Sequence, residues 1–205
     1  MQKSFAVILI VVLLGTTNSL LALDQSGKIK ELEQRISKLE KSLQPIFAQQ
    51  KAKENITKLQ AQARKKMRND SKIYSRKQLQ EIEALYQSRG HKWGSAQKIK
   101  NLKLVISKYP KANRAGCAML YLGQTSKGQA RENYLKQAIE KHSDCFYGDG
   151  MQVGPYAKFN LALTYLKSEK KPQAAALFNE IKTKFPDAID HRGRNLVSMI
   201  KNIKI

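Results

Sequence analysis

The residues best suited to chemistry are concentrated in one short stretch of the chain. Asp144-Cys145-Phe146-Tyr147-Gly148-Asp149-Gly150 places two carboxylates beside two glycines, a combination that could form a cation-binding loop. The stretch supplies too few oxygen ligands for calcium, and no glutamate closes it. We therefore expect a structured insertion between helices, with its turns made by Gly148 and Gly150 and its aromatic side chains packed down.

The three histidines, His91, His142 and His191, are scattered, and each stands near an expected helix boundary. The sequence contains no Gly-x-Ser-x-Gly, His-Glu-x-x-His or Cys-x-x-Cys motif and no glycine-rich phosphate loop. It therefore predicts no catalytic residue, no metal site and no cofactor, which points away from an enzyme.

Two cysteines, Cys117 and Cys145, are separated by 28 positions. Cys117 falls in the first helix of an expected helix pair, and Cys145 follows the second helix, so the antiparallel pair would bring them to the same end. In an oxidising compartment a disulfide is reasonable. The alternative is that Cys117 is a small buried hydrophobe and Cys145 is a free thiol.

The composition indicates an all-α protein. Of 205 residues, 41% are hydrophobic, and helix-favouring Leu, Ala, Lys, Gln and Glu dominate. We expect a signal at 1–22, a coiled-coil or linker helix at 24–70, and a helical-repeat domain at 71–205.

The N-terminus has the layout of a secretory signal. A basic start is followed by the apolar run Phe5–Leu14 and by small residues that suit cleavage after Ser19 or Ala22. The alternative is an uncleaved inner-membrane anchor over Phe5–Leu23. Either interpretation places the rest of the chain outside the cytoplasm, in a bacterial periplasm or secreted.

A heptad seam follows the signal. Its apolar residues are spaced alternately by three and four positions: Ile29, Leu32, Ile36, Leu39, Leu43 and Ile46. Lys28 and Arg35 fall at g positions and Glu33 and Glu40 at e positions, which favours parallel pairing of two chains. A lone amphipathic helix remains the alternative. Pro45 should end or kink this helix.

The remainder of the chain repeats itself. Val105–Ala112 and Ile181–Ala188 carry similar residues 76 positions apart. A second register, 44 positions apart, matches Cys117, Ala118, Tyr121, Ala130 and Tyr134 with Leu161, Ala162, Tyr165, Ala174 and Phe178. Self-similarity at a fixed period is the mark of an α-solenoid.

These positions resemble the tetratricopeptide (TPR) pattern of Leu, small, Tyr, Ala, aromatic and Pro. The match is close in Pro155–Asp187, moderate in Lys111–Ser143 and weak in Ser75–Pro110, and Asp190 should start a C-terminal capping helix. With its short coil and the stretch Lys108-Tyr109-Pro110…Leu120-Tyr121-Leu122-Gly123, the chain resembles the periplasmic cell-division coordinators of the Tol–Pal system, the CpoB (YbgF) family. The shorter coil, the insertion and the basic charge depart from that family.

The resemblance implies a scaffold whose first helices line a groove for a protein partner. The groove positions map to Ala115, Met119, Leu122, Tyr156, Phe159, Leu163 and Lys167. The apolar members could instead pack against the preceding helices.

The charge suggests a second kind of partner. Thirty-eight Lys and Arg against sixteen Asp and Glu give a net charge of +22. Such a surface attracts anionic lipid or cell-wall polymer, whereas export argues against nucleic acid. Because the charge is spread along the chain, a solvated basic surface without a specific partner is the alternative.

Overall fold

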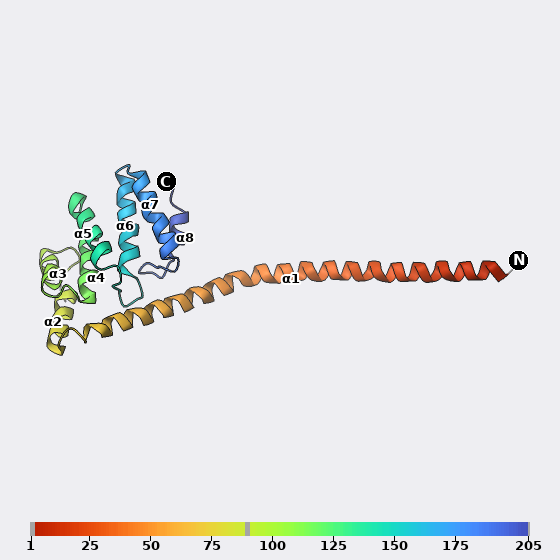
Figure 1. Cartoon of the computed structure of the whole chain (residues 1–205), viewed down its shortest axis with the longest axis horizontal. Helices are drawn as coiled ribbons and strands as arrows, with labels where there is room; N and C mark the ends of the chain where they lie inside the picture. Colours follow the sequence, from red (N-terminus) through yellow and green to blue (C-terminus); the bar gives the residue numbers. More distant parts are fainter. Residues whose placement is uncertain (1–2, 89–90, 205) are drawn as a thin grey trace. The chain divides into compact units, whose positions relative to one another are not determined.

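The computed structural model of the chain consists of helices joined by short loops (Figure 1). The structure describes the backbone of residues 3–88 and 91–204, and the side chains of residues 27–88 and 91–204. Within those residues every regular element is an α-helix, and strand-like pairing is limited to two isolated bridges. The expected all-α class is therefore confirmed.

The described helices are α1 (Lys3–Asp70), α2 (Arg76–Gln87), α3 (Ala96–Lys108), α4 (Asn113–Thr125), α5 (Gly128–Lys141), α6 (Val153–Lys167), α7 (Lys171–Lys184) and α8 (Leu196–Lys201). The chain divides into two compact units, residues 1–51 and 52–205.

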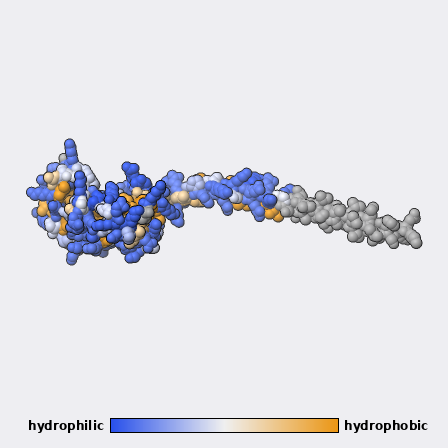
Figure 2. Space-filling view, turned by 90° about the horizontal axis from the view of Figure 1, so that it is seen from above, coloured by the Kyte–Doolittle hydropathy of each residue, from blue (hydrophilic) through white to orange (hydrophobic). Residues whose placement is uncertain are grey.

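The first unit is the N-terminal part of α1. The proposed signal at 1–22 and the alternative anchor at 5–23 fall where side chains lie outside the described residues. No helix in the described part of the chain is long and apolar enough to span a membrane. The six seam residues from Ile29 to Ile46 are 41–61% exposed, and Figure 2 shows hydrophobic residues at the surface of this segment. A single chain therefore leaves the seam uncovered.

Helix α1 does not end at Pro45, although we expected a break there. The helix continues through this proline to Asp70. Proline removes the one hydrogen bond that its N–H would donate to residue 41, and the neighbouring turns carry the helix across the gap.

The second unit begins with the last turns of α1, earlier than the boundary at 71 that the sequence indicated. Leu59 and Ala63 of α1 are buried in a small cluster with Phe146 and Ile189, which belong to two different loops. We expected residues 24–70 to be a coiled coil or linker, but their last part carries a thin apolar stripe from Ile56 to Met67, of which Leu59 and Ala63 pack against the loops of the second unit.

Polar contacts fix the end of α1 to the start of α4. Asp70 is buried and accepts the backbone N–H of Asn113 at 2.9 Å. Burial raises the pKa of Asp70 above its usual value, against the lowering effect of that hydrogen bond. The side-chain amide of Asn113 in turn donates to and accepts from the backbone of Phe146, both at 2.7 Å.

Local signals set the helix boundaries. Ser75 and Gln78 form a reciprocal capping box at α2, and the side chain of Ser95 caps α3. Pro172 stands in the first turn of α7, where its missing N–H costs nothing. Asn195, rather than the expected Asp190, caps α8.

Helices α4–α5 and α6–α7 form two successive antiparallel pairs that share one core (Figure 1). The first helices match at the expected spacing of 44, since Ala118 and Ala162 are both buried. The second helices match at 43 instead, because Leu135 is the buried counterpart of Phe178, while Tyr134 is only half-buried. Ala118 and Leu135 are 17 positions apart, whereas Ala162 and Phe178 are 16 apart, and this difference shifts the register by one.

The loop after each pair is also repeated. Val153 N–H donates to the Cys145 carbonyl at 2.8 Å, and Leu196 N–H donates to the Ala188 carbonyl at the same distance, 43 positions later. Gly150 and Gly193 occupy the same place in the two loops with φ of 96° and 75°, values that favour glycine. The stretch that we expected to be a unique insertion is therefore part of the repeat.

Candidate binding groove

Four of the seven expected groove residues are buried in the core, and two others, Leu163 and Lys167, line a cleft described below. Ala115, Met119 and Leu122 of α4 are at most 4% exposed, so they belong to the core and line no open surface in this chain. Phe159 is also buried, between Tyr156 and Phe178, with ring centroids 6.3 Å and 6.0 Å away. These members pack against neighbouring helices, as our alternative held.

A cleft of about 530 Å³ lies elsewhere in the second unit. It is assembled from five helices (α2 to α6), the loop before α3 and the two repeated loops, so its residues are far apart in the sequence. They are Tyr86, Gln87, His91, Trp93, Lys98, Tyr121, Gln124, Arg131, Tyr147, Asn160 and His191.

Aromatic rings form one wall of this cleft. Trp93 lies against Tyr121 with ring centroids 3.8 Å apart and 46° between the planes, yet 68% of Trp93 remains exposed. The Tyr121 hydroxyl accepts the backbone N–H of Gly94 at 2.9 Å, which fixes the loop that carries Trp93. A large aromatic side chain is therefore held in place while most of its surface faces solvent.

Lys98 holds the adjoining edge. Its ammonium group donates to the carbonyls of Tyr86 and Gln87, the latter at 2.8 Å, where α2 ends. The ammonium also lies 5.5 Å from the ring centroid of Tyr86 and 5.8 Å from that of Tyr121. Burial lowers the pKa of Lys98, against the opposing effect of Glu83.

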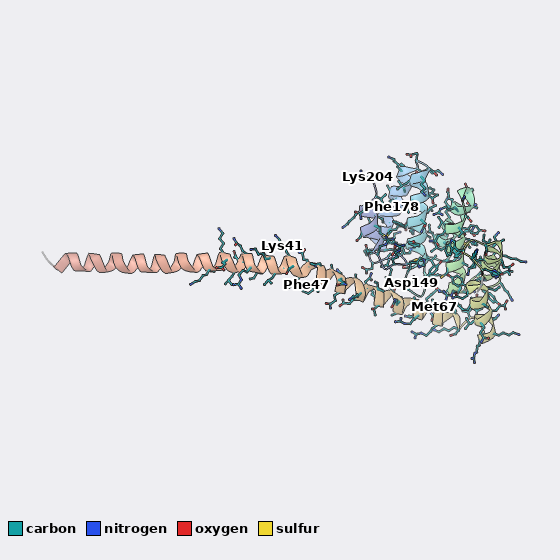
Figure 3. All side chains as sticks on the ribbon, turned by 180° about the vertical axis from the view of Figure 1, so that it is seen from behind. Lys41, Phe47, Met67, Asp149, Phe178 and Lys204 are labelled. Carbon is teal, nitrogen blue, oxygen red and sulfur yellow. The ribbon has the colours of Figure 1, made fainter. Side chains whose placement is uncertain are left out.

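The opposite wall comes from the repeated loops. The Tyr147 hydroxyl donates to the Cys117 carbonyl at 2.8 Å, and His191 packs edge-on against the Tyr147 ring at 4.7 Å. Burial raises the pKa of Tyr147 well above its usual value, so this hydroxyl remains a hydrogen-bond donor. In Figure 3, Asp149, the carboxylate partner of His191, is labelled at the loop near Met67 of α1.

Arg131 stands where this cleft meets a second one of about 420 Å³. Its guanidinium donates to Thr164 Oγ1 at 2.9 Å and to the Gln124 carbonyl at 3.0 Å. The second cleft contains two of the expected groove residues, Leu163 and Lys167. Its lining is Ser126, Lys127, Gly128, Arg131, Leu163, Thr164, Lys167 and Ser168. We call the two clefts together the groove.

Sequence reasoning missed most of the groove. The isolated Trp93 between two helical stretches was the one available signal, because an aromatic residue in a short polar connection has no core to join. Nothing in the spacing of Tyr86, Tyr121 and Tyr147 indicates that they converge.

Both cysteines are free, buried thiols, which corresponds to the second of our two alternatives. Cys117 Sγ lies 3.4 Å from the Phe146 carbonyl, and the side chain of Cys145 packs against Gly116. Burial raises the pKa of Cys145 to about 12 and raises that of Cys117 further. Neither sulfur is set up as a nucleophile.

The scattered histidines of the sequence do not all lie apart: His91 and His191 line the same cleft, and His142 is not among its lining residues. His142 is buried, and burial lowers its pKa. The two carboxylates of the 144–150 loop have separate partners, since Asp144 contacts Lys66 and Asp149 contacts His191. Among the side chains that the structure describes, no three His, Cys, Asp or Glu residues cluster as a metal site would require.

Comparison of the chain with protein-family models, with curated proteins and with solved structures found no match. The functional argument therefore rests on the geometry of the groove and on the charge around it.

Proposed function

We propose that this chain is a non-catalytic scaffold that binds a segment of another protein in the groove. The supporting observation is the meeting of two clefts at Arg131, bordered by Trp93 and Tyr121. Concave sites with aromatic walls and a few placed polar groups are the usual form of a binding site. Trp, Tyr and Arg are also the residue types that contribute most binding energy at protein interfaces.

The finer architecture is part of the same proposal. The repeated pairs α4–α5 and α6–α7, with α8 after them, support a small TPR-like solenoid with a C-terminal cap. The apolar N-terminus supports export, and with it a place in the cell envelope and kinship with the Tol–Pal coordinators.

Site-specific photo-crosslinking tests the groove in the full chain. A photoreactive residue in place of Gln124 should give one discrete adduct in envelope extract, and Tyr121→Ala should remove it. The matched control replaces Lys201, which is exposed on α8. Equal crosslinking from both positions, or no adduct from any groove position, would overturn the proposal.

We also propose that two copies pair in parallel through the exposed seam. In a parallel pair, Lys28 and Arg35 meet Glu33 and Glu40 of the partner, whereas an antiparallel pair would set like charges opposite one another. The seam ends at Ile46, since the next a and d positions are the polar residues Gln50, Lys53, Thr57 and Gln60. Pairing would present two grooves and raise avidity for a multivalent partner.

Light scattering tests this pairing. The full chain should have twice the mass of one protomer, and Leu32→Glu with Leu39→Glu should halve that mass without loss of helix content. A monomeric parent chain would reject the pairing.

A second candidate function is binding of anionic lipid or cell-wall polymer. Residues 51–77 contain two acidic residues, of which Asp70 is buried, against ten basic ones: Lys51, Lys53, Lys58, Arg64, Lys65, Lys66, Arg68, Lys72, Arg76 and Lys77. Adsorption to anionic vesicles should fade at about 0.5 M salt, where screening is strong. It should weaken with Arg64→Gln and Lys65→Gln but not with Tyr121→Ala. Vesicle binding that ignores salt would contradict this candidate.

A further inference from the structure

The charge of the groove is one-sided. Of the residues that line its two clefts in the described part of the chain, none is Asp or Glu. The cationic members are Lys98, Lys127, Arg131 and Lys167, with His91 and His191 beside them. A ligand in this groove therefore meets positive charge along its whole length.

The sequence around the groove strengthens this asymmetry. No acidic residue occurs between Glu83 and Glu132, although ten Lys and Arg lie in that interval. The carboxylates nearest the groove are already paired: Glu83 binds Arg114 at 2.8 Å, Glu132 binds Lys136 at 2.8 Å, and Asp149 binds His191 at 2.7 Å. None of these three ion pairs involves Lys127, Arg131 or Lys167, so they leave the positive charge of those groove residues in place.

We infer that the ligand of the groove is an acidic peptide segment that also carries an aromatic or large apolar side chain. This inference rests on the proposed function and adds the chemistry of the partner. Arg131, at the meeting point of the clefts, is placed to bind a carboxylate, and guanidinium–carboxylate contacts are both strong and directional.

The remaining lining favours a peptide over a polyphosphate or a lipid surface. Lys98 and Arg131 each already donate to two protein acceptors, so the groove offers a few fixed cationic points and no dense array for phosphates. Gln87, Gln124 and Asn160 supply amides, the groups that pair with a peptide backbone. Trp93 and Tyr121 supply an apolar surface for a side chain.

Selection from a displayed library tests the inference without a known partner. Random peptides of about 12 residues, which extend to about 40 Å, are panned against the full chain. Selected peptides should be enriched in Asp and Glu near an aromatic residue. Their binding should change the fluorescence of Trp93, the single tryptophan of the chain.

Charge variants then locate the contact. Arg131→Gln should weaken a selected peptide about tenfold or more, since it removes a charged hydrogen-bond donor. Lys204→Gln makes the same change in charge at an exposed position near the C-terminus (Figure 3) and should have no effect. If Arg131→Gln fails to fold, Lys167→Glu, on an exposed side chain, should shift the selection toward basic peptides.

The outcomes separate the two claims. If no peptide is enriched over panning against Tyr121→Ala, the protein-binding function itself fails. If peptides are enriched without acidic bias, the groove stands and the inference about its ligand is overturned. Tighter Trp93-reported binding of an oligonucleotide or of anionic vesicles than of any selected peptide would also overturn the inference.

Discussion

His191 Nδ1 lies 2.7 Å from Asp149 Oδ2, and this contact joins two loops that hold equivalent places in successive repeats. The rings of Tyr147 and Tyr156 pack edge-on against the same imidazole, with centroids at 4.7 Å and 5.7 Å. Because His191 and Tyr147 line the larger cleft, the contact connects the packing of the loops to the shape of the groove.

Asp149→Asn should destabilise the chain at neutral pH and much less in acid. Burial raises the pKa of Asp149, but hydrogen bonds from His191 and from the Met151 N–H outweigh it and hold the pKa below its usual value. A lowered pKa contributes stability above the unfolded pKa of about 4 and loses it as the pH falls through the folded value. The side chain is 39% exposed, so solvent screening limits the loss to less than about 1 kcal/mol.

Urea unfolding of the parent chain and of Asp149→Asn at about pH 7 and about pH 2.5 measures this effect. An equal difference in unfolding free energy at both pH values would contradict the assigned role of the carboxylate.

Leu59→Ala should cost about 2–3 kcal/mol, because it opens a cavity between α1 and the two loops. Leu39→Ala makes the same substitution in the same helix, where the side chain is 61% exposed, and should leave the unfolding free energy of an unpaired chain nearly unchanged. Chemical denaturation followed by circular dichroism compares the two in the background of a chain made monomeric by Leu32→Glu. Equal losses would mean that the last turns of α1 do not dock.

Gly116→Ala should destabilise by about 1–3 kcal/mol through overpacking. A Cβ at this position would lie 2.6 Å from both Cβ and Sγ of Cys145, and 2.8 Å from His142 Cβ. Gly148→Ala is the control, because its Cβ would meet its nearest neighbour, Met67, at 3.9 Å. The melting temperatures of both variants test this prediction. If Gly116→Ala melts at the same temperature as Gly148→Ala, then Gly116 of α4 does not lie in contact with Cys145.

Cys117 and Cys145 should both resist thiol reagents in the native chain. Since burial raises the pKa of Cys145 to about 12 and that of Cys117 further, the thiolate fraction at about pH 8 is very small. Both should react rapidly in urea. Thiols are counted in urea without reductant. Two reactive thiols per chain would confirm that both cysteines are free, whereas no reactive thiol would indicate a disulfide.

The helix pairs could be predicted because small and aromatic residues recur at helical spacing. Ala162 and Phe178 are buried as their spacing indicated, and Leu196 and Ile200 of α8 form one buried face. The error of one position in the second helices has a simple cause. Apolar residues stand at both Tyr134 and Leu135, so spacing alone cannot decide which one faces the core.

The groove could not be predicted from the same patterns. Residues 115–123 of α4 are all buried. This part of the helix therefore has no exposed polar face, and its sequence does not indicate which side would face solvent. The resemblance to the TPR pattern had mapped Ala115, Met119 and Leu122 to the groove, whereas α2, α3 and α5 cover them. The docking of α1 was also missed, because the stripe from Ile56 to Met67 is too thin to distinguish a linker from a packed helix.

The spacing of two salt bridges along α1 corresponds to the spacing of two successive repeats. Asp144 and Asp187 occupy equivalent places 43 positions apart, and they contact Lys66 and Lys58 of α1. Those lysines are eight residues apart, which corresponds to about 12 Å of helix. Eight residues of α1 therefore span the distance between equivalent points of two successive loops. A chain that gained one more 43-residue copy would need about eight further residues of docked helix to remain in step with its loops.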